Sequence, residues 1–497
     1  MARLRTEWLT LVAAACAPQA TSHFQFESSP SGDGSTEPAQ VLLRPFEPRV
    51  RTAPQNLPDA GTPFGGPGPW PIAHVTYSRS QGILETPIVG HSTDEAQNRW
   101  VATHQALYLL RPGDSVFRRF GSAEGLHLQD NPERYCDSNF SGGDKSCPIF
   151  GAAADPGITT IVGGGPNEVF VGYAGIDDGP GDWSDLDRHS GKLDRVRLRS
   201  DGTLQVDRFD FVANAHGAQY WHNRTVQRLV FDHFLHPHEL YVGMNHGVTL
   251  VRPDQFRRPN PGEWFDAVNL EYMADHLHAR VCYHAPCDAT TSNQRMGDWR
   301  GLALSPDGNL WTAGKWTAGK IVWHEDLYTW FSRPGGDTFA ESFGDPYPLP
   351  DNGNGYVNEP VFRPPAEGDP VHLSAVSVAS DGRVWFASDP PASSGDPAYG
   401  VAVWDGRRFI TFDPVAQLGM AERKVVDLVA LPDGRVVVAG PSTGLVVYDP
   451  ASGRSVPLRA PAYLADDNVQ RLELDTMVSP PALHVSTWSG ASVLRGF

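Results

Sequence analysis

An acidic segment that also contains glycine is the first candidate for a metal site. The run 177–187 includes five aspartates: Asp177, Asp178, Asp182, Asp185 and Asp187. Ca²⁺ takes six to eight oxygen ligands, and carboxylates on a flexible loop can supply them. Because the spacing differs from that of an EF-hand loop, a solvated acidic loop is the alternative interpretation. The sequence therefore offers Ca²⁺, or another divalent cation, as a candidate cofactor without fixing it.

Histidines and one tryptophan form a second set of candidate ligand-binding residues. His216 and His222 precede one predicted strand, whereas His276 and His278 lie in the next long insertion. Imidazoles from neighbouring loops could meet as a metal or general-base site, and an exposed Trp183 could stack on a sugar or a peptide. Ordinary polar loop residues are the alternative for the histidines, and a loop anchor is the alternative for the tryptophan.

A third group falls in a short predicted turn. His233, His236 and His238 lie between Asp232 and Glu239. These residue types can bind a metal at the surface, but a polar turn explains them equally well.

Other catalytic classes lack their signatures. The chain has no nucleophile elbow, phosphate-binding glycine loop, haem attachment motif or zinc-protease helix. We therefore assign no catalytic residue. The formal net charge of −18, without a basic stripe, argues against nucleic acid as a partner.

The five cysteines divide into two close pairs and one single residue. Cys136 with Cys147, and Cys282 with Cys287, are close enough to form disulfides. The remaining Cys16 follows a short apolar run after Arg3 and Arg5, in the order of a secretory signal. We expect a signal peptide over 1–20, with either lipidation of Cys16 or ordinary cleavage near residue 20, followed by a Pro/Gly-rich tether over 21–70.

The elements that would position these residues repeat along the chain. Each copy has an apolar strand, a tight turn, a second strand that ends in a small residue, and two more strands. Asp-Gly turns are clearest at Asp307, Asp381 and Asp433, and seven copies of the second strand can be counted. Sheets of this size bury both faces only by packing on one another, and a ring closes the array. We predict an all-β, seven-bladed β-propeller over 71–497, with six or eight blades as alternatives.

Details of the predicted blades follow from the same repeat. The blades are four-stranded and antiparallel, and a strand from residues 72–77 or 41–43 completes the last one. Fourth strands are expected at 327–331 and, more weakly, near Trp264. The long insertions should all leave one face and bind a ligand there: 121–157, 173–191, 259–298, 333–371 and 388–400.

One repeat resembles a known family. Residues 99–114 carry Arg-Trp-Val-Ala-Thr followed by Ala-Leu-Tyr-Leu-Leu, and 445–450 repeat the third strand with its Asp-Pro turn. Both are similar to the propeller repeat of bacterial two-component sensor ectodomains. The resemblance implies a propeller and carries over no catalytic residue. Because no kinase follows residue 497 in this sequence, we expect a stand-alone propeller.

These observations lead to three functional hypotheses. The first is an extracytoplasmic, envelope-associated scaffold that binds a protein, peptide or glycan through its insertion-rich face. It would be a monomer and would reach the membrane only through a lipid anchor. The second is a metal-dependent hydrolase or lyase with an axial site, and the third is a detached sensor ectodomain.

Overall fold

The structure is a computed structural model, and it describes the sheets and the shorter connections between them. The described residues are 72–128, 157–174, 192–210, 225–254 with short gaps, 270–275, 300–321 with short gaps, 340–342, and 372–496 with short gaps.

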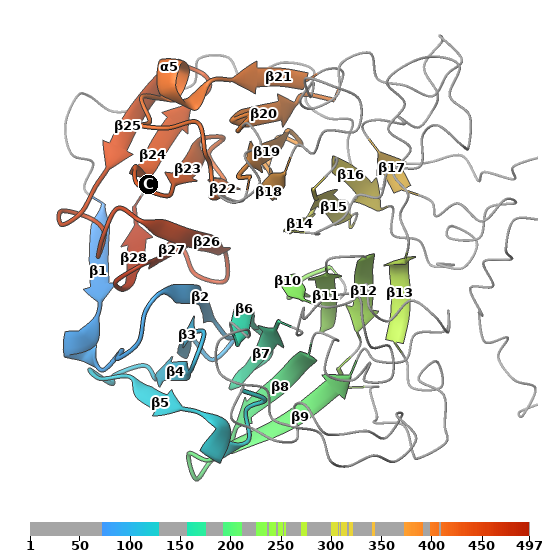
Figure 1. Cartoon of the computed structure of the whole chain (residues 1–497), viewed down its shortest axis with the longest axis vertical. Helices are drawn as coiled ribbons and strands as arrows, with labels where there is room; N and C mark the ends of the chain where they lie inside the picture. Colours follow the sequence, from blue (N-terminus) through green and yellow to red (C-terminus); the bar gives the residue numbers. More distant parts are fainter. Residues whose placement is uncertain are drawn as a thin grey trace, which may run out of the picture.

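The described residues form seven four-stranded antiparallel sheets arranged around a common centre (Figure 1). In chain order the first three contain β2 (Ile88–Thr93), β3 (Arg99–Thr103), β4 (Leu107–Leu110) and β5 (Arg118–Phe120); β6 (Ile158–Gly163), β7 (Glu168–Tyr173), β8 (Lys192–Leu198) and β9 (Leu204–Asp210); and β10 (Val226–Asp232), β11 (Glu239–Met244), β12 (Gly247–Val251) and β13 (Leu270–Asp275). The next three contain β14 (Gly301–Leu304), β15 (Leu310–Ala313), β16 (Ala318–Ile321) and β17 (Ala340–Ser342); β18 (Leu373–Val378), β19 (Val384–Ser388), β20 (Val401–Trp404) and β21 (Phe409–Phe412); and β22 (Asp427–Ala430), β23 (Val436–Gly440), β24 (Gly444–Asp449) and β25 (Arg454–Leu458).

The seventh sheet is built from both ends of the described chain. It contains β26 (Val469–Asp475), β27 (Ala482–Thr487) and β28 (Ala491–Arg495), and its fourth strand is β1 (Ala73–Tyr77). β1 pairs antiparallel with β28, from Ala73 opposite Arg495 to Tyr77 opposite Ala491 (Figure 1). The first of the two expected closing strands is therefore confirmed. Pairing the two strands removes a free sheet edge and joins the ring.

Short helical segments occupy three of the connections that the structure describes. They are the 3-10 turns η1 (Arg79–Gln81) and η2 (Ser122–Glu124) and the α-helix α5 (Pro414–Leu418). Asp413 caps α5 by accepting a hydrogen bond from the Val415 backbone N–H at 2.9 Å. None of the helices that the structure describes is long and apolar enough to cross a bilayer.

The Asp-Gly turns form because glycine takes a positive φ angle that other residues resist. Gly382 has φ 84° and Gly434 has φ 89°. In the second of these turns the Asp433 carboxylate accepts hydrogen bonds from the Arg435 backbone N–H at 3.1 Å and from its Nε at 2.6 Å. The local sequence thus fixes the hairpin between the first and second strands.

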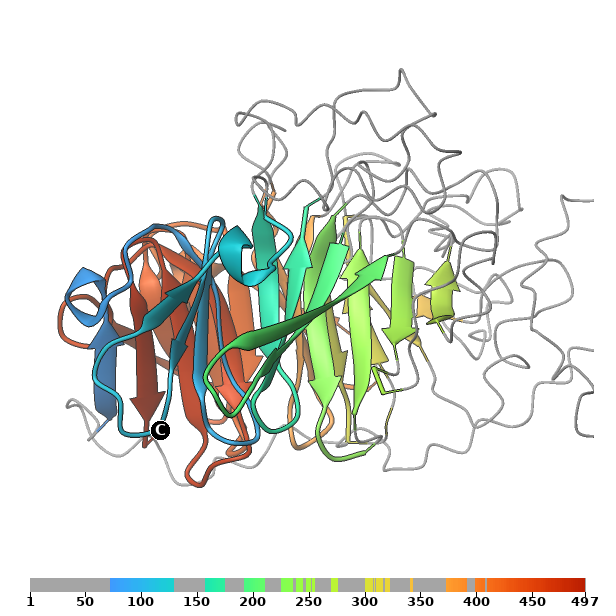
Figure 2. The ribbon, with the colours of Figure 1, turned by 90° about the horizontal axis from the view of Figure 1, so that it is seen from below.

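Apolar side chains fill the space between neighbouring sheets. Trp385 stacks on Phe412 with ring centroids 5.6 Å apart, and Tyr448 from the next sheet packs against Phe412 edge-on at 5.5 Å. Each such buried side chain contributes about 1.5–3 kcal/mol of transfer free energy. Seen from the side, the strands run along the axis of the ring (Figure 2). The core is therefore a series of inter-sheet layers around that axis.

Two outer strands lie later in the chain than expected. The fourth strands of the third and fourth sheets are β13 and β17, not the segments near Trp264 and at 327–331. The connections from β12 to β13 and from β16 to β17 therefore start at the end of the ring where the first-to-second turns lie. The predicted insertions 259–298 and 333–371 are therefore each divided by an outer strand.

Candidate functional site

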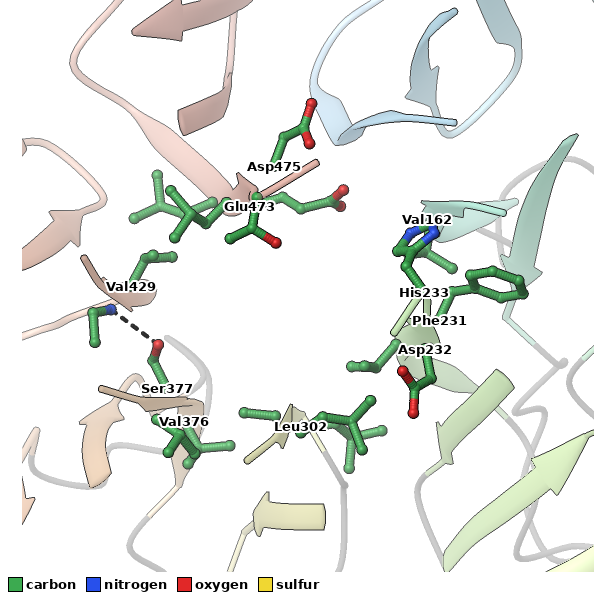
Figure 3. Close-up of a pocket in the computed structure, with 18 of the residues that line it drawn as sticks. Val162, Phe231, Asp232, His233, Leu302, Val376, Ser377, Val429, Glu473 and Asp475 are labelled. Carbon is green, nitrogen blue, oxygen red and sulfur yellow. Dashed lines mark hydrogen bonds between the residues drawn. The ribbon is translucent and has the colours of Figure 1, made fainter. Parts of the chain in front are cut away.

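A pocket of about 570 Å³ lies on the axis of the ring (Figure 3). It is lined by the first strand of every sheet, and these contribute Thr93, Ile161, Phe231, Leu302, Val376, Val429 and Glu473. The lining continues into the first-to-second turns, so the pocket opens at that end. Its volume falls in the range of small-molecule sites, about 300–1,000 Å³.

The first strand of each sheet is an edge strand, and side chains of the neighbouring sheet satisfy parts of its backbone. In the pocket wall the Ala430 backbone N–H donates to the Ser377 hydroxyl at 2.9 Å (Figure 3). Two further bonds of this kind join Gly163 N–H to Ser92 Oγ at 2.7 Å and Leu472 N–H to Asp427 Oδ2 at 2.9 Å. These bonds tie successive sheets together around the axis and give the pocket a rigid wall.

A β-bulge recurs near the start of the first strand in most of the sheets. In five of the described sheets the pairing with the second strand skips the second residue of the first strand. The residues that follow the skip are Gly90, Thr160, Arg228, Ala375 and Arg471. A bulge redirects the side chain that follows it. In this ring it aims two arginines at the axis.

These arginines span the axis and form the inner end of the pocket. Arg471 donates from Nη1 to Thr160 Oγ1 at 2.7 Å and from Nη2 to the Gln227 carbonyl at 3.2 Å. Arg228 donates from Nη1 to Asp427 Oδ2 at 2.9 Å. The bonds link the seventh sheet to the second and third, and the third to the sixth. We call Arg228, Asp427 and Arg471 the axial floor.

Glu473 lies beside the axial floor and holds its proton near neutral pH. It accepts a hydrogen bond from the Ser92 hydroxyl. Burial raises the pKa of Glu473 to about 8 and outweighs the opposite effects of Ser92 and of the two guanidinium groups. Burial also lowers the pKa of Arg471 to about 9, so Arg471 remains charged at pH 7. A titratable group with a perturbed pKa inside a pocket is a typical feature of functional sites.

The rim of the pocket combines satisfied carboxylates with exposed apolar side chains. Asp475 accepts a hydrogen bond from Thr93 Oγ1 at 2.7 Å. Asp232 accepts from the backbone N–H groups of Phe234 at 2.9 Å and Leu235 at 2.8 Å. Those two apolar side chains are 65% and 44% exposed. The opening of the pocket is therefore largely apolar, and the carboxylates of Asp232 and Asp475 already accept hydrogen bonds from the protein.

The histidine turn contributes to this rim without forming a metal site among the described residues. His233 Nδ1 lies 3.1 Å from Glu95 Oε1, whereas His238 Nδ1 lies 3.8 Å from Asp254 Oδ2. The two imidazoles thus turn to different carboxylates, and His236 lies outside the described residues. In the part of the chain that the structure describes, no three His, Cys, Asp or Glu side chains could hold a metal ion.

The other predicted site residues lie outside the described residues. They are the aspartates Asp177, Asp178, Asp182, Asp185 and Asp187, the ligand candidates Trp183, His216, His222, His276 and His278, and the cysteines Cys16, Cys136, Cys147, Cys282 and Cys287. The proposed Ca²⁺ loop, the disulfides and the lipidation stay predictions.

The residues of the axial floor were not among the predicted site residues, although the sequence contains a signal for them. The first strands of the third and seventh sheets share the phrase Val-Gln-Arg-Leu, at 226–229 and at 469–472. In the sixth sheet, residues 425–428 read Val-Val-Asp-Leu, which puts Asp427 where the other two have arginine. Comparing the first strands by position would have found this set.

Comparisons with known proteins found solved structures whose fold is similar to that of this chain, at low sequence identity. No family model and no curated protein matches the chain. The extracellular domain of a hybrid two-component system from B. thetaiotaomicron matches with 10% identity and a TM-score of 0.47 over 86% of this chain, but over only 42% of its own length. Virginiamycin B lyase from Staphylococcus aureus matches with 8% identity and a TM-score of 0.44, covering 85% of this chain and 99% of the lyase. A chain of the mitotic checkpoint complex matches with 10% identity and a TM-score of 0.46, covering 85% of this chain and 95% of its own. Such values carry no argument about activity or ligand, so the function must be argued from the pocket itself.

Proposed function

We propose that this chain is an extracytoplasmic binding protein that holds a small ligand in its axial pocket. The observation that carries the proposal is the pocket itself, with a wall from every sheet and an inner end formed by charged side chains that span the axis. Concave, mostly apolar sites with a few convergent polar groups are the usual form of small-molecule sites. The signal-like segment at 1–20 and the paired cysteines support the location outside the cytoplasm.

This proposal moves the binding surface from the face suggested by the sequence. The insertion-rich face remains a candidate for a protein, peptide or glycan partner, and the loops that would test it lie outside the described residues. The axial pocket opens at the other end of the ring, beside the first-to-second turns. A detached sensor ectodomain would use the same pocket and pass its occupancy to a partner protein.

Blocking the mouth of the pocket tests the proposal. Thr476 is exposed and lines the mouth, so Thr476→Trp places an indole over the opening. Asp114→Trp is the matched control because Asp114 is exposed and lies outside the pocket lining. The assay is the shift in melting temperature of the purified protein with a panel of small carboxylates, alcohols, amines and sugars.

Two outcomes are decisive. We expect at least one saturable shift in the wild type, its loss in Thr476→Trp, and its retention in Asp114→Trp. Binding that persists unchanged in Thr476→Trp, or no binding of any probe to the wild type, would contradict an axial ligand site. Metal analysis of the same preparation tests the hydrolase or lyase hypothesis, which requires a stoichiometric divalent cation.

A further inference from the structure

The charge at the inner end of the pocket selects among ligand classes. The axial floor contains two arginines and one aspartate, and the equivalent positions in the first, second and fifth sheets carry no charge: Gly90, Thr160 and Ala375. The floor therefore has one positive charge in excess. A buried charge requires a partner, and an anionic ligand group would provide one.

The excess charge can be assigned to Arg471. Arg228 is matched by Asp427, whose Oδ2 also accepts the Leu472 N–H while its Oδ1 accepts the Leu428 N–H. Arg471 bonds only to neutral acceptors, and no carboxylate in the described part of the chain forms an ion pair with it. A guanidinium has five N–H donors, and Arg471 uses two of its nitrogens in these bonds. It is also partly exposed in the pocket lining.

The nearby acids do not supply the missing negative charge. Glu473 is the nearest candidate, but its pKa of about 8 keeps it neutral at pH 7. The carboxylates of Asp232 and Asp475 lie at the rim, where they accept hydrogen bonds from neutral backbone and hydroxyl donors, and among the described residues neither forms an ion pair with Arg471. The deep end of the pocket is therefore cationic below pH 8, although the whole chain is acidic.

The walls above the floor suit the body of an apolar ligand. Val162, Leu302, Val376 and Val429 line the pocket (Figure 3), whereas the ring of Phe231 points away from it and stacks on Phe170. Apolar side chains favour a hydrocarbon or an aromatic body over a sugar, whose hydroxyl groups would lose their hydration here. We propose that the axial pocket binds amphipathic monocarboxylates, with the carboxylate on the Arg471 guanidinium and the apolar body along these walls. The inference rests on the proposed function and names its ligand class.

Three probes of equal chain length test the head group. Decanoate, decanol and decylammonium share one apolar body and differ in charge, and calorimetric titration at pH 7 below their aggregation concentrations gives each affinity. We expect decanoate to bind at least tenfold more tightly than decanol, because charge-assisted bidentate hydrogen bonds are stronger than neutral ones. Decylammonium should show no measurable binding, since the floor repels it.

Arg471→Met removes the cation and retains an unbranched apolar side chain. It should weaken decanoate binding about tenfold or more and leave decanol binding unchanged. The matched control is Arg423→Met, because Arg423 is 64% exposed and pairs with Asp413 outside the pocket. Circular dichroism and the melting temperature check that each variant is folded.

A second variant tests the same site without changing its cation. Raising the pH from 7 to 9 ionises Glu473 beside Arg471, so wild-type affinity for decanoate should fall about fivefold or more, while decanol binding stays constant. In Glu473→Gln the fall should shrink to the part that comes from deprotonation of Arg471, whose pKa is about 9. The charged groups that act on this carboxyl are Arg228, Arg471 and Asp475. Arg471 is also influenced by Asp427 and Arg300, and the variant alters none of these groups.

The failures of the two proposals are distinguishable. Equal binding of decanoate, decanol and decylammonium that disappears in Thr476→Trp would overturn the carboxylate inference and leave the axial pocket as the binding site. Decanoate binding that survives Arg471→Met unchanged would also overturn it. Probes that bind equally well to the wild type and to Thr476→Trp would overturn the proposed function itself.

Discussion

Lowering the pH from 7 to 5 should weaken the seam between the first and the seventh sheet through two buried histidines. His91 on β2 and His484 on β27 lie edge to face, with ring centroids 4.3 Å apart, and they are 2% and 1% exposed. Neither nitrogen of His91 has a hydrogen-bond partner in the described part of the protein. Burial lowers the pKa of His484 to about 3, and the cations of Arg99 and Arg495 add to the effect. The pKa of His91 is also lowered, mainly by burial.

The magnitude follows from the linkage between protonation and folding. A histidine in the unfolded chain takes up its proton near pH 6.5, whereas folded His484 stays neutral down to about pH 3. Its contribution to stability is therefore present above pH 6.5 and is lost as the pH falls below it, by about 2 kcal/mol at pH 5. His91 acts in the same direction. Glu473 acts in the opposite direction, because its raised pKa makes its contribution grow by about 2.5 kcal/mol between pH 7 and pH 5.

Because these effects oppose each other, the test is a difference between variants. The free energy of unfolding in urea is measured at pH 7 and pH 5 for the wild type, for His484→Leu, and for His74→Leu as an exposed-histidine control. When the pH falls from 7 to 5, the free energy of unfolding of the wild type should change by about 2 kcal/mol more in the destabilising direction than that of His484→Leu. The control should behave like the wild type. An identical change in the wild type and in His484→Leu would refute the reasoning, whatever the absolute stability of the variant.

Further predictions concern the floor, the closure and the core. Because the pKa of Glu473 is raised to about 8, the free energy of unfolding of the wild type should fall by about 4 kcal/mol between pH 5 and pH 9. Glu473→Gln should remove this loss in urea unfolding, and an unchanged loss would contradict a buried, protonated carboxyl. A chain starting at residue 78 lacks β1 and should expose the edge of β28, so light scattering should detect aggregates that a chain starting at residue 72 does not form. Trp100→Phe removes the hydrogen bond from the indole N–H to Asp94 at 2.9 Å and should destabilise the fold by about 1–3 kcal/mol; a change below 0.5 kcal/mol in thermal unfolding would show that Asp94 does not depend on this bond.

The sequence predicts the inner strands well because burial on both faces gives them a strong pattern. The second strand at Arg99–Thr103 and the third strand at Gly444–Asp449 lie where the repeats at 99–114 and 445–450 placed them. Outer strands have a neighbour on only one side, and their sequences are less constrained. For this reason the apolar run at 327–331 looked more like a strand than β17, which contains Ala, Glu and Ser.

The axial floor could not be predicted from polarity alone. Arg228 and Arg471 stand within apolar first strands, where a charge looks like an interruption of the pattern. Their approach to the axis depends on a bulge in the strand pairing, and the sequence shows no mark of a register shift. Conversely, the aspartate candidates and most of the histidine candidates were chosen from long insertions, whose residue types can be read from the sequence but whose positions in space cannot.

The pairing of β1 with β28 joins the first strand of the ring to be synthesised to the last one. The ribosome makes Ala73–Tyr77 before any other strand of the ring, yet the partner of this segment, Ala491–Arg495, is made last. During translation, and during any transport of the extended chain, the earliest strand must wait with its hydrogen-bonding groups open to water or to a chaperone. The last of the seven sheets can therefore form only after the strands of the other six have been made, and until then the open edges of the growing chain invite self-association.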